Sequence, residues 1–189
     1  MTLVTLPDEV VRAAQRGDER AFATIVDAYQ LPVFNFVLRL VSDRELAEDL
    51  TQDVFARAYS SLPRFSFRSK LSTWLFRIAK NRVIDEVRAQ SCRPQAEELT
   101  ELELHAFDPP AERIETMDAL WSAVAKLSVD YKEALLLRDV VGLSYTEIAE
   151  ATNQSLANVK WRIYRARSDV AAELEAAGFG SEATPQRAA

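Results

Sequence analysis

The side chains best suited to specific recognition chemistry in this 189-residue chain lie between Ser155 and Ser168. This segment contains four cations and no acid. The cations are Lys160, Arg162, Arg165 and Arg167, and they alternate with Asn158, Trp161 and Tyr164. Arg and Lys pair with phosphate or guanine, and Asn can read adenine, whereas a solvated helix usually mixes both charge signs. The segment therefore predicts a helix docked on DNA; a basic surface helix without a partner is the alternative.

A second basic group lies in residues 57–88, which hold eight cations and two acids. Aromatic and cationic side chains together can bind single-stranded nucleic acid, because bases stack on rings while cations follow the backbone. The candidate residues for this role are Phe65, Arg68, Lys70, Trp74, Arg77, Lys80 and Asn81. Any single aromatic residue here is more commonly part of a core, so the charge cluster is the stronger signal.

An acidic stripe is expected on one helix, formed by Glu45, Glu48, Asp49, Gln52 and Asp53. Like charges on one helix face cost stability unless a partner uses them. The stripe indicates either a solvated face or a docking surface for a basic partner.

No catalytic or metal-binding set is apparent in the sequence. The single His105 and the single Cys92 have no neighbours with metal-ligand spacing, and there is no glycine-rich phosphate loop. We therefore expect no enzymatic activity and no cofactor. One cysteine suits a reducing cytosol. The N-terminus lacks the pattern of a signal peptide and no apolar run approaches a membrane span, so we expect a cytoplasmic protein without membrane insertion.

The net charge of −6 is unevenly distributed, because residues 92–117 hold seven acids and two cations. Two basic clusters separated by an acidic strip suit a chain that contacts DNA twice.

The residues around the basic segment have the sequence pattern of a helix-turn-helix, which would position that segment. Ser144 and Glu147 have the spacing of a capping box, Asn153 tolerates the left-handed turn, and Ser155 offers a second N-cap. A buried stripe is expected at Leu156, Val159 and Ile163.

The rest of the chain also has helical periodicity, few glycines and no strand pattern, which predicts an all-α fold of two small domains. The first domain covers 8–90. Its first three helices are expected at 8–16, from Asp18 onward and from Pro32 onward. A fourth helix is expected over Asp43–Tyr59, preceded by a Ser42–Glu45 capping box, and a fifth at 73–89. Trp74, Arg77, Lys80, Asn81 and Arg82 are expected on the outward face of its last helix. The composition also predicts a loop at 61–72, an acidic flexible linker at 91–112 and a second domain at 113–175. That second domain adds helices at 112–126 and 129–140, and the chain beyond Ala172 is expected to fray, with a disordered tail at 176–189.

With these motifs in order, the chain resembles a bacterial RNA polymerase sigma factor of the extracytoplasmic-function (ECF, sigma-70 group 4) type over about residues 10–175. The matching segments are GDERAFATIVDAY, DLTQDVFARAY, FRSKLSTWLFRIAKNRVIDEVR and LRDVVGLSYTEIAEATNQSLANVKWRIYRAR. The resemblance implies a promoter-specificity subunit that directs polymerase to −35 and −10 elements, with an anti-sigma factor as its regulator.

The resemblance also assigns roles to single residues. Asp49, Gln52, Asp53 and Phe55 fall on the helix that docks on the clamp of the polymerase largest subunit. The segment 65–81 would melt and hold the −10 strand, and Asn158, Lys160, Trp161, Tyr164 and Arg165 would lie at the −35 major groove.

Some positions depart from the family pattern. Asp53 replaces a common Glu, Asn153 replaces a frequent turn Gly, Ala157-Asn158 replace Gly-Thr, and Trp161 is much bulkier than usual. Two other functions remain open at this point, a stand-alone helix-turn-helix regulator and a helical protein–protein adaptor.

Overall fold

The computed structural model of the protein describes residues 3–91 and 111–179. Within these two ranges all regular structure is helical, as the sequence predicts. Cys92 and His105, most of the predicted linker and the tail from residue 180 lie outside the described residues.

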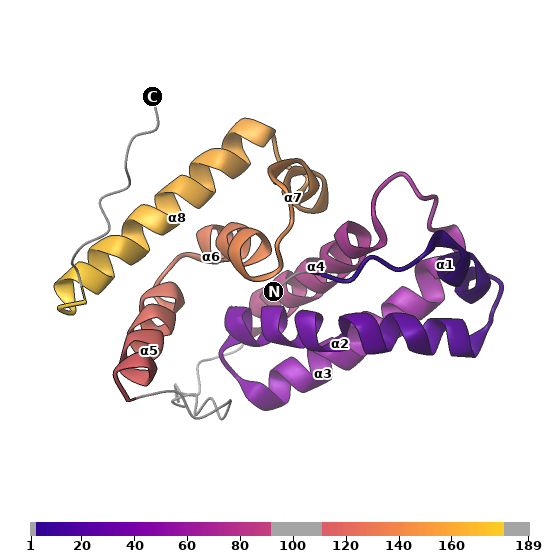
Figure 1. Ribbon diagram of the computed structural model, residues 1–189, viewed down its shortest axis with the longest axis horizontal. Coiled ribbons are helices and arrows are strands. Elements are labelled where there is room, and N and C mark those ends of the chain that lie inside the picture. Colours follow the sequence, from indigo (N-terminus) through magenta and orange to yellow (C-terminus); the bar gives the residue numbers. More distant parts are fainter. Residues whose placement is uncertain (1–2, 92–110, 180–189) are drawn as a thin grey trace.

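The first helical unit contains α1 (Asp8–Gln15), α2 (Glu19–Val41), α3 (Arg44–Ser61), the short 3-10 turn η1 (Leu62–Arg64) and α4 (Leu71–Ser91). Helices α2, α3 and α4 pack together around a buried core, and α1 lies across the end of α2 (Figure 1). The largest fully buried side chains of this core include Tyr29, Phe36, Leu50 and Phe76.

Pro32 does not begin a helix, so that prediction is wrong: it lies inside the continuous helix α2. Proline in a helix interior removes a hydrogen bond and typically costs ~3 kcal/mol. The helix nevertheless continues because buried residues flank the proline, among them Tyr29, Val33 and Phe36. Burial of those side chains offsets the local cost.

The Ser42–Glu45 capping box is also wrong. Ser42 ends α2 in a left-handed conformation with φ 56°, and its backbone N–H donates to the Leu38 carbonyl. Asp43 caps α3 instead, because its carboxylate accepts from the backbone N–H of Leu46 at 3.0 Å.

The second helical unit contains α5 (Ala111–Ala125), α6 (Val129–Leu135), the π-helical turn η2 (Leu136–Val140), α7 (Tyr145–Thr152) and α8 (Leu156–Ala176). Helix α8 packs along α5, α6 and α7. It continues to Ala176, so the expected fraying from Ala172 is wrong.

The turn between α7 and α8 follows the sequence prediction closely. Ser144 and Glu147 form the complete capping box, Asn153 has φ 53°, and the Ser155 hydroxyl accepts from the Asn158 backbone. Val159 and Ile163 are each 1% exposed. Leu156 is 39% exposed, so its predicted burial is wrong, because the first turn of α8 extends past the edge of the core.

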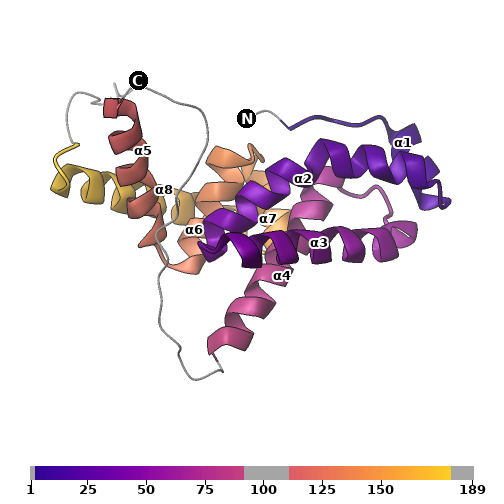
Figure 2. The same cartoon turned by 90° about the horizontal axis from the view of Figure 1, so that it is seen from below.

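The two units contact each other. Helix α7 packs against α4, and α6 and η2 pack against α2 (Figures 1 and 2). Two specific contacts cross this boundary: Lys70 Nζ pairs with Glu147 at 2.8 Å, and the Arg39 guanidinium lies 3.5 Å from the centroid of the Trp121 ring.

One helix among the described residues, α2, is long and apolar enough to cross a membrane by length and composition alone. Core helices of soluble proteins pass the same test, and here α2 packs against α1, α3 and α4.

Candidate nucleic-acid interface

The outer face of α8 is a candidate DNA-reading surface. Lys160, Trp161, Tyr164 and Arg165 are all exposed on it. Trp161 is 55% and Tyr164 74% exposed, far more than a core would leave uncovered. The Trp161 ring meets Tyr131 of α6 edge-to-face at 5.7 Å, which restrains the indole while one side stays open. Four of the five predicted −35 residues are therefore exposed together on this helix, and the fifth, Asn158, is half-buried.

Three of the four cations of α8 have acidic partners that the sequence analysis missed. Arg162 pairs with Asp130 at 3.1 Å and Arg167 with Asp139, so both tie α8 to the preceding helices. The pair with Asp139 raises the pKa of Arg167 above its ordinary value. These partners lie 28 or 32 residues away in sequence, where no local spacing rule could find them. Arg165 pairs with Asp169 on α8 itself at 3.1 Å.

Asn158 is held in place by a residue that the sequence analysis did not include. Its side-chain amide donates to Gln154 Oε1 at 2.6 Å. The spacing of four residues between two amides is a recognisable signal for such a pair. The bond fixes the direction of the Asn158 side chain at the start of α8.

The aromatic residues of the second candidate surface are buried. Phe65 is 7% and Trp74 8% exposed, and their ring centroids lie 5.1 Å apart. The expected outward placement of Trp74 is therefore wrong, because it packs beneath the loop instead of facing solvent. These two rings shape the loop between α3 and α4.

The loop itself is held by α1. The Gln15 amide donates to the carbonyls of Leu62 and Phe65, at 3.0 and 2.7 Å. Arg12 lies 4.3 Å from the centroid of the Phe67 ring, and Phe67 has φ 56°, an uncommon conformation for a bulky residue. Neither Arg12 nor Gln15 was a sequence candidate, because their partners are distant along the chain.

The polar members of this surface are mostly exposed. Arg68, Arg77 and Asn81 are open to solvent, and Lys80 is half-buried. Lys70 is exposed but pairs with Glu147 of α7. Burial opposes ionisation of Glu147, yet its hydrogen bonds with Lys70 and Ser144 outweigh that effect and lower its pKa.

The predicted docking helix is α3. Asp49, Gln52 and Asp53 are exposed on it, whereas Phe55 is 8% exposed and faces the core. Arg82 of α4 donates to Asp53 at 2.9 Å and to Glu86 at 3.0 Å, so the two helices are tied beside the acidic stripe.

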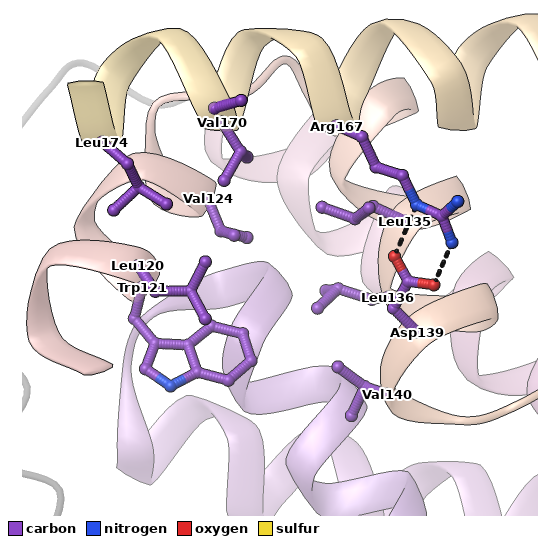
Figure 3. A pocket seen from close by; sticks show the side chains of 11 residues that line it. Leu120, Trp121, Val124, Leu135, Leu136, Asp139, Val140, Arg167, Val170 and Leu174 are labelled. Carbon is purple, nitrogen blue, oxygen red and sulfur yellow. Dashed lines mark hydrogen bonds and ion pairs between the residues drawn. The ribbon is translucent and has the colours of Figure 1, made fainter. Parts of the chain in front are cut away.

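A pocket of about 290 Å³ lies among α5, α6, η2 and α8 (Figure 3). Its lining is almost wholly apolar, including Leu120, Trp121, Val124 and Leu174, and the Asp139–Arg167 pair lies at one side. The apolar lining would bury an apolar group. Among the described residues, no three or more His, Cys, Asp or Glu side chains gather as a metal site would need.

A helix-turn-helix with an exposed basic-aromatic second helix defines a DNA-binding protein. The comparisons with known proteins narrow this class. Residues 25–92 match the family model of sigma-70 region 2, and residues 117–170 match that of sigma-70 region 4.

Curated relatives extend the match over nearly the whole chain. The ECF RNA polymerase sigma factor SigC of Mycobacterium tuberculosis is 37% identical over 93% of this chain and 97% of its own length. The ECF RNA polymerase sigma-E factor of Escherichia coli is 32% identical over 87% of this chain and 93% of its own. The chain belongs to the ECF sigma factors of RNA polymerase, and the stand-alone regulator and adaptor interpretations are not favoured.

Solved structures of sigma factors have the same fold as this chain. CnrH in complex with the cytosolic domain of CnrY is 27% identical, with a TM-score of 0.69 over 88% of this chain and 96% of that one. The sigma factor RpoE of Bartonella quintana, in complex with the anti-sigma factor NepR, has the same fold, with 23% identity and a TM-score of 0.66 over 82% of this chain and 96% of that one.

Proposed function

We propose that this protein is the promoter-specificity subunit that directs core RNA polymerase to −35 and −10 elements. The observation that carries the proposal is the exposed face of α8, with Trp161, Tyr164 and Arg165 on a helix-turn-helix, in a chain of this family. In the −35 major groove, Arg165 and Lys160 pair with guanine edges or phosphates. Asn158, oriented by Gln154, reads adenine.

The first unit captures the −10 strand. Arg68, Arg77 and Asn81 are its exposed polar contacts, with Lys70 and Lys80 beside them. The buried rings of Phe65 and Trp74 support the loop. The exposed cations can follow the backbone of a single strand, whereas the rings of Phe65 and Trp74 are buried and offer no face on which a base can stack.

The exposed stripe Asp49, Gln52 and Asp53 docks on the clamp of the polymerase largest subunit, and Phe55 supports it from the core. An anti-sigma factor holds the protein inactive by covering these surfaces. The protein acts in the cytoplasm and performs no chemistry itself, because the polymerase makes the RNA.

Run-off transcription tests the proposal. The purified chain is added to sigma-free core polymerase with a library of promoter sequences, and start sites are mapped. We expect initiation at defined positions that share −35 and −10 motifs. Absence of any defined start, with core polymerase shown to be active with another sigma factor, would refute the proposed function.

A further inference from the structure

Two side chains of α1 hold the loop between α3 and α4, which carries part of the proposed −10 surface. The Gln15 amide donates two hydrogen bonds, to the carbonyl oxygens of Leu62 at 3.0 Å and Phe65 at 2.7 Å. Arg12 lies three residues earlier, on the same face of the helix, with its guanidinium carbon 4.3 Å from the centroid of the Phe67 ring. The loop is therefore fastened to α1 at both its backbone and its side chains.

Helix α1 is itself fixed on the first unit. It packs against α2 and η1, and its inward residues Val11 and Ala14 are 1% and 5% exposed. These residues directly precede Arg12 and Gln15 in sequence, so the two side chains that hold the loop start from an immobile backbone. Such a helix can impose one conformation on a loop that has no regular structure of its own.

The loop needs such support because its backbone is strained at Phe67. This residue has φ 56°, a conformation that costs free energy for a bulky side chain and persists only where its surroundings hold it. The Phe67 ring is held between Arg12 and Phe65, whose ring centroid lies 4.9 Å away. Arg68 follows directly and is exposed, so the conformation at Phe67 sets where this cation leaves the loop.

We propose that α1 is a working part of the −10 reader, in which Gln15 is a positioning residue that presets the loop for capture of a single DNA strand. This inference rests on the proposed function of the first unit. Helix α1 lies outside residues 25–92, which match sigma-70 region 2. Gln15 acts through the two loop carbonyls and does not contact the DNA. A loop already in its binding conformation loses less freedom when the strand binds, so the affinity for the strand depends on this clamp.

The test compares full-length variants that differ at one side chain. Gln15→Met keeps the approximate length of the side chain and removes both donors. Gln15→Asn keeps the donors on a side chain that is one methylene shorter, and it is the second variant should Gln15→Met fail to fold. The matched control is Gln30→Met, because Gln30 is exposed on α2. Circular dichroism and thermal unfolding establish that each variant is folded.

Two measurements follow on the folded variants. Hydrogen exchange of the free chain, read by mass spectrometry, reports on the loop. Fluorescence anisotropy with holoenzyme reports affinity at several salt concentrations, for a single-stranded oligonucleotide carrying the −10 motif that run-off transcription defines and for a −35 duplex.

We expect Gln15→Met to speed exchange in residues 62–70 alone. If the released loop is competent in about one molecule in ten, affinity for the −10 strand should fall about tenfold. The salt dependence of that affinity should not change, because no phosphate contact is lost. Gln15→Asn should show a smaller loss, and Gln30→Met should match the wild type. Affinity for the −35 duplex should be unchanged in all variants.

Wild-type affinity of the folded Gln15→Met variant for the −10 strand would overturn the inference. Faster exchange throughout the chain, with equal losses on both DNA probes, would also overturn it by showing a general role in stability. A shallower salt dependence would do so by making Gln15 a direct phosphate contact. If only Gln15→Asn folds, the same criteria apply to it.

Run-off transcription separates these outcomes from failure of the proposed function. A wild-type chain that initiates at defined positions with core polymerase keeps its function even if the Gln15 variants bind the −10 strand normally. A wild-type chain that never initiates loses the proposed function, whatever the hydrogen exchange of the loop.

Discussion

At the scale of single residues, the cations of α8 divide into two groups. Arg162 and Arg167 pair with Asp130 and Asp139 and hold the helix in place. Lys160 has no ion-pair partner among the described residues, and Arg165 pairs only with Asp169, one turn along the same helix. The second group is therefore the one available to DNA.

Replacement of Arg165 by alanine should weaken binding to a −35 duplex by about 1–3 kcal/mol if it pairs with a base edge. Fluorescence anisotropy with holoenzyme measures this. The control is Lys126→Ala, because Lys126 pairs with Glu173, near the C-terminal end of α8 and away from the turn that precedes it. Unchanged transcription from a promoter that requires its −35 element would contradict this role.

Glu133 predicts a specific pH dependence of stability. Burial raises its pKa from 4.5 to about 7. The negative charge of Asp130 also raises it, and the positive charges of Lys80 and Arg162 lower it by less. The folded protein therefore holds this proton more tightly than the unfolded chain. Its contribution to stability is largest below pH 4.5 and falls as pH rises through 7.

Glu133→Gln removes this ionisation while keeping the side-chain shape. We expect the free energy of unfolding of the variant, relative to that of the wild type, to increase by up to roughly 3 kcal/mol between pH 5 and pH 8. Urea titrations at several pH values measure the difference, with Glu150→Gln as control. Parallel curves for wild type and Glu133→Gln would show that the carboxyl is not buried as described.

At the scale of elements, the turn between α7 and α8 depends on one left-handed residue. Asn153 has φ 53°, a conformation that glycine adopts freely and β-branched residues resist. Asn153→Gly should leave stability within a few tenths of a kcal/mol, and Asn153→Val should lose about 1–2 kcal/mol. Thermal unfolding compares the two variants, and equal losses would rule out backbone strain as the cause.

We propose the polymerase-docking role for the exposed side of α3, which carries Asp49 and Asp53. Reversal of Asp49 and Asp53 to Lys should abolish association with core polymerase, because the acidic stripe becomes basic. Size-exclusion chromatography with core enzyme measures association. Circular dichroism must show unchanged helicity, because Asp53→Lys also removes the Arg82–Asp53 ion pair between α4 and α3. Glu19→Lys with Asp27→Lys, also exposed but on α2, is the control. Wild-type association by the α3 variant would remove the docking assignment.

The sequence predicts well those elements whose signals are local. The Ser144–Glu147 capping box, the Asn153 turn and the Ser155 cap each involve residues within four positions of one another. Local signals fail at Pro32, because burial of its neighbours keeps α2 continuous there, and at Ser42, because Asp43 caps α3 instead. The burial of Trp74 is not evident from the sequence, because its polar neighbours along the chain do not show that it packs against Phe65 of the preceding loop.

Contacts distant in sequence could not be predicted at all. Gln15 holds the carbonyls of the loop at 61–72 across 47 and 50 residues, and Glu147 reaches Lys70 in the other unit. No periodicity or spacing rule encodes such pairs. The candidate site was therefore predictable as a set of residue types, but the distant contacts that hold it in place were not.

At the scale of the whole molecule, two separate units contact one promoter. Arg77 on α4 and Arg165 on α8 share no partner. In holoenzyme, the losses caused by Arg77→Ala and Arg165→Ala should add within about 0.5 kcal/mol, as expected for independent sites. Open-complex formation on one promoter, measured for both single variants and the double variant, tests this. A double variant much weaker or stronger than the sum would show that the two units are coupled on DNA.

The internal anchoring of Arg162 and Arg167 has a practical consequence. Because the residues that keep α8 seated are different from those that face outward, the outward positions can be randomised without loosening the helix. A library at Asn158, Lys160, Trp161, Tyr164 and Arg165 should thus yield folded proteins with new promoter preferences, which makes this unit a ready scaffold for orthogonal gene circuits.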